Sequence, residues 1–191
     1  MITRPIYNIE SGVDQTKHHW FENSFDEVKL DWINNLVELY PLESATTIGG
    51  EKEYRNSSVR WLYYDQFSAW VYDDLGALIM EANKSWKFDL YSVIDSIQYT
   101  EYNESGGHYD WHVDIGPSIA HRKISIVTQL SDPDEYEGGD LQIWAGGEYK
   151  TVPKSKGGSV VFPSFLMHRV TPVTKGIRKS LVLWVGGGSY K

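Results

Sequence analysis

The segment His108-Tyr-Asp-Trp-His-Val-Asp114 contains the pattern His-x-Asp twice, as His108/Asp110 and as His112/Asp114. In a β-strand, residues two apart point to the same face, so each pair offers an imidazole nitrogen and a carboxylate oxygen side by side. An isolated pair of this kind is commonly a hydrogen-bonded surface or core feature. It indicates a metal site when a third ligand arrives from a distant strand, and the residues alone leave open which pair that would be.

His168 is the candidate for the third ligand. It follows an apolar run at the start of a predicted strand, whereas His18 and His19 lie in a polar stretch and His121 in a predicted loop. A buried histidine is ordinarily a hydrogen-bonded core residue. Two histidines and one carboxylate on one face of a metal, however, are the ligands of non-haem Fe(II) oxygenases, and they leave positions open for a chelating 2-oxo acid and dioxygen.

Arg178 lies ten residues after His168. If Val173–Ile177 forms a short hairpin, His168 pairs with Val182 and Arg178 with Pro172, so that Arg178 shares the face of the histidine at about 13 Å along one sheet. An arginine that points into a β core is costly unless an anion meets it. This spacing suits a short dicarboxylate with one end on a metal and the other on the guanidinium group.

The elements that must position these residues differ between the two parts of the chain. Residues 1–90 predict a first helix after the capping-box sequence Ser24-Phe-Asp-Glu27 and a second helix from about Asp65 to Ala82. The expected packing faces consist of apolar residues three or four apart: Phe25, Val28, Trp32, Ile33, Leu36 and Leu39, then Phe67, Val71, Leu75, Leu78 and Ala82.

From about residue 90 the apolar period changes to two, and Gly-Gly pairs separate short segments. Eight strands are predicted within residues 91–102, 108–114, 123–131, 139–144, 149–153, 158–164, 167–173 and 178–185. We expect a mainly β fold with supporting helices, a double-stranded β-helix (jelly roll). It would be a single domain over 1–191, with a helical supporting region over about 1–90 and a jelly-roll catalytic core over about 91–188.

Composition narrows the class of protein. The absence of cysteine excludes disulfides, thiolate metal sites and a cysteine nucleophile. A formal net charge of −8 argues against a nucleic-acid partner. The N-terminal segment MITRPIYNIESG has no apolar run of signal-peptide length, and no later window is long and apolar enough to span a membrane. We therefore expect a cytoplasmic protein without a membrane partner.

Three motifs follow one another over about residues 95–187: YTEYNESGGHYDWHVD, LSDPDEYEGGDLQIW and GGSVVFPSFLMHRVTPVTKGIRKSLVLWV. They combine an aromatic-rich strand before His-x-Asp, a Gly-Gly strand entry, a Phe-Pro-Ser segment, a distal histidine and a basic residue ten positions beyond it. In this order they resemble the Fe(II)/2-oxoglutarate-dependent dioxygenases, in particular the prolyl 4-hydroxylase-like branch that includes the Pro-Lys hydroxylase type. The resemblance implies Fe(II), 2-oxoglutarate, O2 and, as a further reductant, ascorbate.

The resemblance also implies roles for particular residues. It assigns iron to His112, Asp114 and His168. By strand alternation His108 and Asp110 share the face of His112 but lie about 13 Å and 7 Å further back along the strand, so we expect them at the approach to the site or its solvent edge, and a direct contact of Asp110 with the substrate stays open. Arg178 matches the anchor for the distal carboxylate of 2-oxoglutarate in the arginine-using branch. The remaining expected co-substrate contacts are Tyr102, Ser180 and either Ser125 or Gln129, while Trp184 matches an aromatic residue of some members or simply packs in the core.

The expected substrate is a prolyl residue in a peptide or protein, and the alternative within the same chemistry is a free amino acid or another small metabolite. Two alternatives come from other classes: a non-catalytic cupin-like binding protein, and a zinc hydrolase with the same ligands. Arg178 argues against the hydrolase, which needs no anchor for a 2-oxo acid. The position and stereochemistry of hydroxylation and the oligomeric state stay open.

Overall fold

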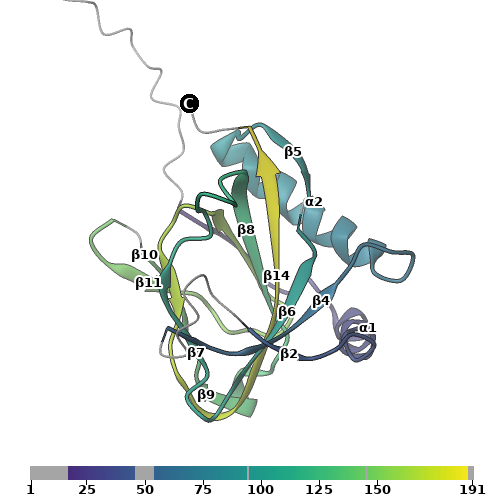
Figure 1. Cartoon of the computed structure of the whole chain (residues 1–191), viewed down its shortest axis with the longest axis vertical. Coiled ribbons are helices and arrows are strands. Elements are labelled where there is room, and N and C mark those ends of the chain that lie inside the picture. Colours follow the sequence, from purple (N-terminus) through teal and green to yellow (C-terminus); the bar gives the residue numbers. More distant parts are fainter. Residues whose placement is uncertain (1–16, 46–53, 94, 145, 189–191) are drawn as a thin grey trace, which may run out of the picture.

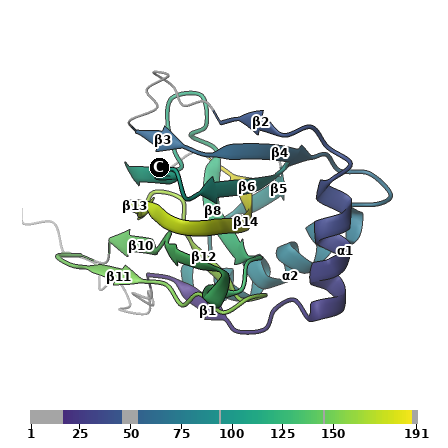
Figure 2. The same ribbon diagram turned by 90° about the horizontal axis from the view of Figure 1, so that it is seen from below.

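The fold is a double-stranded β-helix in which two β-sheets face one another and helices cover the outer side of the larger sheet (Figures 1 and 2). The computed structural model describes residues 17–45, 54–93, 95–144 and 146–188. The described part of the chain contains no helix that is long and apolar enough to cross a lipid bilayer. The mainly β jelly roll with supporting helices is confirmed by this architecture and by the solved structures described below.

The elements that precede the metal-ligand motif lie between residues 19 and 103. They are β1 (His19–Phe21), α1 (Glu27–Val37), β2 (Glu43–Ser44), β3 (Arg55–Asn56), β4 (Ser58–Leu62), α2 (Ala69–Trp86), β5 (Leu90–Val93) and β6 (Ile97–Asn103).

The remaining elements carry the metal-ligand motif and most of the barrel. They are β7 (His108–His112), β8 (Arg122–Gln129), the 3-10 helix η1 (Pro133–Glu135), β9 (Tyr136–Gly138), β10 (Leu141–Trp144), β11 (Tyr149–Thr151), β12 (Ser159–Pro163), β13 (His168–Val170) and β14 (Val173–Gly187).

Among the described residues, the large sheet has the strand order β1-β12-β8-β14-β6-β4-β2, with β5 and β9 also paired to β14. The small sheet has the order β11-β10-β13-β7-β3. The region before residue 90 thus supplies strands β1 to β4 as well as the two helices. β1 lies beside β12, so His19, expected in a solvated stretch, is paired with Val161 at a sheet edge.

Alternation along the central strands of the large sheet separates two cores. On β8, Ile124 and Ile126 face the helices, where they pack with apolar residues of α1 and α2. Val127 faces the small sheet and packs against residues such as Phe162 and Ile143. Because side chains alternate along a strand, the residues on the inner face of the large sheet are the ones that can line a site between the sheets.

The helices begin and face differently from the sequence prediction. The N-cap of α1 is Asp26, whose side chain accepts from Lys29 N, whereas Ser24 donates to Gly157 O. The buried face of α1 is Leu30, Ile33, Leu36 and Val37, and the expected Val28, Trp32 and Leu39 are exposed. In α2 the prediction of Val71, Leu75 and Ala82 is confirmed, but Phe67 precedes the helix and is exposed.

The predicted hairpin at Val173–Ile177 is wrong. Residues 173–187 form one continuous strand, β14, which pairs with β6 and β8 in the large sheet, whereas β13 pairs with β10 and β7 in the small sheet. His168 therefore pairs with His112 and Ile143, not with Val182. The histidine and Arg178 lie on opposite sheets, so the distance predicted along one sheet does not apply.

Candidate metal and co-substrate site

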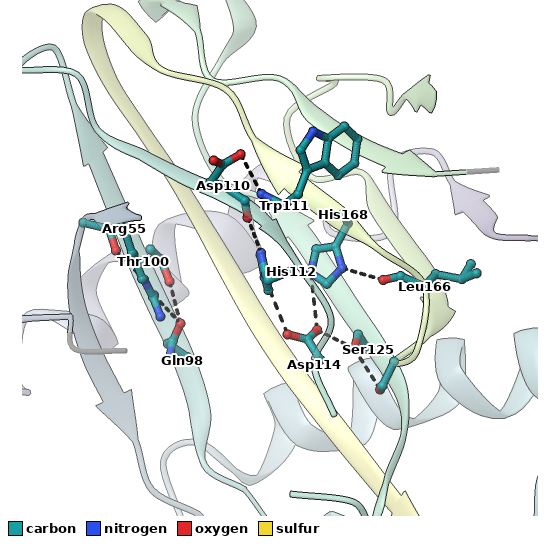
Figure 3. A network of polar contacts seen from close by, with 12 residues as sticks. Arg55, Gln98, Thr100, Asp110, Trp111, His112, Asp114, Ser125, Leu166 and His168 are labelled. Carbon is teal, nitrogen blue, oxygen red and sulfur yellow. Dashed lines mark hydrogen bonds and ion pairs between the residues drawn. The ribbon is translucent and has the colours of Figure 1, made fainter. Parts of the chain in front are cut away.

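Three side chains meet where β7 ends and β13 begins. The register of the two strands places His112 directly opposite His168, and Asp114 follows two residues after the end of β7. Asp114 Oδ1 lies 3.7 Å from His112 Nε2, and Asp114 Oδ2 lies 3.5 Å from His168 Nε2 (Figure 3). The three ligand atoms lie within 4.8 Å of one another.

Backbone carbonyls set the tautomer of both histidines. His112 Nδ1 lies 2.7 Å from Asp110 O, and His168 Nδ1 lies 2.9 Å from Leu166 O. A carbonyl can only accept, so each Nδ1 carries the proton and each Nε2 presents a lone pair to Asp114. Second partners of this kind orient metal-binding histidines. Two imidazole lone pairs and one carboxylate facing a common point fit an Fe(II) ion.

Asp114 is held in place by two hydrogen bonds. Its backbone N–H donates to Ser164 O at 2.9 Å, and Ser125 Oγ donates to its Oδ2 at 2.7 Å. Burial alone would raise the pKa of Asp114, but His168, His112 and the Ser125 hydroxyl hold it below its usual value. The group is therefore a buried carboxylate that favours a cation beside it.

Burial, and then the neighbouring His168, lower the pKa of His112 to about 3. Its imidazole is consequently neutral near pH 7, which is the form that binds metals. The Trp184 indole also lies close enough to Asp114 to lower the pKa of that carboxyl, although its Nε1 forms no hydrogen bond of standard geometry with the described residues.

A β-bulge in β7 changes which side chains accompany His112. His168 pairs with His112 while Val170 pairs with Tyr109, so three residue steps on β7 match two on β13. The extra residue shifts the alternation. Tyr109 therefore shares the cavity with His112, and their rings stack with centroids 3.4 Å apart. Burial raises the pKa of the Tyr109 phenol to about 12, so it stays protonated.

Because of the same bulge, the first His-x-Asp pair, His108 and Asp110, does not share the cavity face with His112. Asp110 is exposed at the solvent edge, where its carboxylate accepts from Trp111 N at 2.7 Å. His108 is half-buried, with its Nδ1 2.7 Å from Gly106 O, and it is outside the cavity lining. Figure 3 shows Asp110 and Trp111 directed away from the three-residue cluster. The structure brings His112, but not His108, to Asp114 and His168.

Arg178 lies on the inner face of β14 and is 1% exposed. Its Nη2 donates to Gln129 Oε1 at 2.9 Å, its Nη1 lies 3.4 Å from Ser180 Oγ, and its Cζ lies 5.4 Å from the centre of the Tyr102 ring. Its Nε has no hydrogen-bond partner among the described residues. A buried cation that contacts only neutral groups is costly, and an anion would satisfy it.

A glycine makes the space for this arginine. Gly139 has φ of +61°, and a Cβ built on it would lie 2.9 Å from Arg178 Cδ. The Gly-Gly pair that sequence analysis treated only as a strand boundary therefore also lets the backbone approach the guanidinium stem. Of the two alternatives for β8, Gln129 contacts Arg178 and Ser125 contacts Asp114.

The three-residue cluster of His112, Asp114 and His168 lines the same cavity as Arg178. This cavity has a volume of about 210 Å³ and lies between the two sheets. Its apolar walls come from both sheets, for example Val127 and Val170, and Trp184 belongs to it as well. Two further arginines line it: Arg55 from β3 and Arg122 from β8. Nothing local in the sequence shows that the strands carrying Arg55 and Arg122 turn toward the site.

Residues 97–186 match the 2OG-Fe(II) oxygenase superfamily. A PKHD-type hydroxylase of Teredinibacter turnerae is 39% identical over 87 residues, which are 42% of this chain and 38% of that protein. A PKHD-type hydroxylase of Synechococcus sp. is 42% identical over 85 residues, which are 44% and 38%. The matched segment thus spans less than half the length of these curated relatives.

Solved structures confirm the fold over nearly the whole chain. A prolyl hydroxylase from Trichoplax adhaerens, solved with a peptide fragment of the hypoxia inducible factor oxygen degradation domain, has a TM-score of 0.76 at 15% identity, covering 90% of this chain and 84% of that one. A prolyl-4-hydroxylase from Pseudomonas putida has a TM-score of 0.70 at 20% identity, covering 91% and 94%. Residues 97–186 are thus similar to the 2OG-Fe(II) oxygenase superfamily and to PKHD-type hydroxylases, and the chain shares the fold of the solved prolyl hydroxylases.

Proposed function

We propose that this chain is an Fe(II)- and 2-oxoglutarate-dependent dioxygenase that hydroxylates a prolyl residue in a peptide or protein. One observation carries the proposal: a two-histidine, one-carboxylate cluster and a buried arginine with an unpartnered Nε line the same cavity. The cluster supplies metal ligands on one side only, and the arginine supplies an anion site within the same space.

In this proposal His112, Asp114 and His168 hold the metal through Nε2, a carboxylate oxygen and Nε2. The chemistry that Fe(II) and 2-oxoglutarate supply when bound is oxygen-dependent hydroxylation of a C–H bond, with succinate and CO2 as by-products. Arg178 binds the distal carboxylate of 2-oxoglutarate, since it lines the cavity and, among the described residues, its Nε has no hydrogen-bond partner and its guanidinium group no acidic partner.

The other co-substrate contacts follow from the surroundings of Arg178. Gln129 and Ser180 orient the guanidinium group through the contacts at 2.9 and 3.4 Å, and Tyr102 covers one of its faces. Apolar residues of the cavity wall, including Val182, lower the polarity around the arginine, which strengthens an ionic contact there.

The prolyl substrate is proposed from the relatives. The curated relatives are PKHD-type hydroxylases, and two solved neighbours are a prolyl hydroxylase with a bound peptide and a prolyl-4-hydroxylase. Tyr109 and Trp61, two aromatic residues of the cavity lining, suit an apolar pyrrolidine ring. A free amino acid or small metabolite is the alternative for the same chemistry.

The test is succinate formation from 2-oxoglutarate, followed by NMR with Fe(II), ascorbate and air, with and without prolyl peptides. Asp114→Ala and His168→Ala are expected to abolish turnover, whereas Asp110→Ala, the matched change in the other His-x-Asp pair, is expected to retain it. Loss of activity in Asp110→Ala but not in Asp114→Ala would contradict the assignment.

The same preparation separates the alternatives. A cupin-like binding protein would bind 2-oxoglutarate without forming succinate in the presence of any peptide. A zinc hydrolase would show no 2-oxoglutarate binding to the metal-loaded protein, measured by isothermal titration without oxygen. Either outcome would refute the proposed oxygenase.

A further inference from the structure

Three arginines and one carboxylate, Asp114, are the charged residues that line the cavity, apart from its histidines. Two of the arginines are accounted for. Arg178 meets the co-substrate in the proposed function, and Arg122 donates from Nε to Asp95 Oδ2 at 2.8 Å. Arg55 remains, and among the described residues no carboxylate lies within 4.0 Å of its guanidinium group. Besides Arg178, the cavity therefore contains a further cation, Arg55, whose charge is not compensated by a described residue.

Neutral groups fix the position of Arg55. Its Nε donates to Ser57 Oγ at 2.8 Å and its Nη2 donates to Gln98 Oε1 at 2.9 Å. Its Cζ lies 4.6 Å from the centre of the Tyr109 ring, which itself stacks on the metal-ligand His112 at 3.4 Å. These two distances bound the separation between Arg55 and the imidazole, so a group bound to Arg55 lies close to the metal ligands.

Gln98 adds a second donor at the same place. It is buried, and its Oε1 accepts from Arg55 Nη2 and from Thr100 Oγ1 at 3.1 Å. A guanidinium group can only donate, so the atom that faces it must be the amide oxygen, and the Nε2 amide group is left as a donor. The described residues provide no acceptor for that Nε2 or for Arg55 Nη1. Figure 3 shows Arg55 and Gln98 together, across from the cluster of His112, Asp114 and His168.

We propose that Arg55 and Gln98 form a subsite that binds a carboxylate of the primary substrate next to the prolyl residue that is oxidised. This inference rests on the proposed function and names its substrate class: acidic prolyl peptides. A planar guanidinium edge with a neighbouring amide matches the two oxygens of a carboxylate. Glu43 lines a smaller cavity of about 70 Å³ that also borders Arg55, but no ion pair within 4.0 Å joins the two residues.

The carboxylate could come from an acidic side chain or from a peptide C-terminus. Two pairs of probes distinguish these sources: Ac-Ala-Pro-Glu-Ala-NH2 against Ac-Ala-Pro-Gln-Ala-NH2, and Ac-Ala-Ala-Pro-OH against Ac-Ala-Ala-Pro-NH2. Peptide affinity is measured by isothermal titration without oxygen, with Fe(II) and 2-oxoglutarate present, and kcat/KM is measured from succinate. In at least one pair the acid is expected to be favoured by about tenfold or more, as for a charge-assisted hydrogen bond.

In Arg55→Gln the acid and the amide are expected to bind about equally. Arg55→Lys is expected to keep part of the preference for the acid, because the positive charge remains although the planar guanidinium group is lost. The matched control is Arg60→Gln, since Arg60 binds Glu38 Oε2 at 2.9 Å outside the cavity lining. This control is expected to keep the wild-type preference. Thermal unfolding checks that each variant is folded.

An acid preference that survives in Arg55→Gln would overturn the subsite, as would equal affinity for acid and amide in both pairs or no binding of either acidic peptide. These failures are distinguishable from failure of the proposed function. Turnover without an acid preference rejects the subsite and keeps the oxygenase. Arg55-dependent selective binding without succinate supports the subsite and rejects the oxygenase.

Discussion

Replacing Arg178 with Met should separate ligand binding from folding. The guanidinium group is 1% exposed, contacts only neutral partners and has an unpartnered Nε among the described residues, while methionine can fill much of the same unbranched volume. An unsatisfied buried donor costs about 1–3 kcal/mol, and this cost disappears in the variant. In return, the variant loses the hydrogen bonds of Arg178 to Gln129 and Ser180, which contribute about 1 kcal/mol each. The ligand-free variant should therefore be nearly as stable as the wild type.

The effect on 2-oxoglutarate should be large. At a concentration one hundred times its Kd, a ligand stabilises the folded state by about 2.7 kcal/mol. For a protein of this size that corresponds to an increase in Tm of roughly 5–11 °C. Losing two charge-assisted hydrogen bonds, at about 1.5–3 kcal/mol each, weakens the affinity more than a hundredfold. At the same concentration the stabilisation of Arg178→Met then falls below about 0.5 kcal/mol.

The assay is thermal unfolding with Mn(II) in place of Fe(II), with and without 2-oxoglutarate. Lys175→Met is the control, because it removes an exposed lysine from the same strand. A full 2-oxoglutarate shift in Arg178→Met would refute the assignment of this residue as the anchor. A Tm of the ligand-free variant that lies far below that of the wild type would refute the argument that its charge is uncompensated.

Ser125→Ala removes the 2.7 Å hydrogen bond to Asp114 and should weaken the metal affinity about tenfold. Competition with a chelator measures this affinity, and an unchanged value would contradict the role of Ser125 in orienting the Asp114 carboxylate. Burial lowers the pKa of His112 from 6.5 to about 3. Between these two pH values the unfolded chain therefore binds a proton at His112 that the folded chain does not bind. The metal-free protein should consequently lose stability as the pH falls through this range. Equal urea midpoints at pH 7 and pH 5 would argue against it. Gly176→Ala places a Cβ 2.1 Å from Glu135 O at a φ of +70°. This variant should lose more stability than Gly146→Ala, where φ is +80° but no atom lies within 4 Å of the added Cβ. Chemical denaturation of both variants measures the difference.

Features that depend on local alternation could be predicted from the sequence. The period-two pattern of residues 123–131 predicts a strand, and in the structure Ile124 and Ile126 both pack in the core beneath the helices, with Ser125 on the opposite face. The same rule placed Arg178 and Ser180 on one face of a strand, and both line the cavity. Side-chain direction along a strand needs no knowledge of its neighbours.

Features that depend on distant pairing could not be predicted. The segment from His168 to Arg178 contains a turn-like sequence, but its two ends join different sheets, because His168 pairs with His112, 56 residues earlier, and Arg178 pairs with Tyr102, 76 residues earlier. The bulge that brings Tyr109 beside His112 likewise depends on how β7 fits β13. On α1, Val28 and Trp32 have helical spacing equal to that of the buried face, so only the position of the sheet decides between the two stripes.

The division of the site between the two sheets has a mechanical consequence. The histidine ligands belong to the small sheet and Arg178 to the large one, so a co-substrate that reaches from one to the other acts as a clamp across the sandwich. Its affinity then depends on the spacing between the sheets, which residues such as Val160 and Phe162 set without touching the ligand. Amide hydrogen exchange at the cavity-lining strands should slow when 2-oxoglutarate binds. Variants that increase the spacing between the two sheets should bind 2-oxoglutarate less tightly.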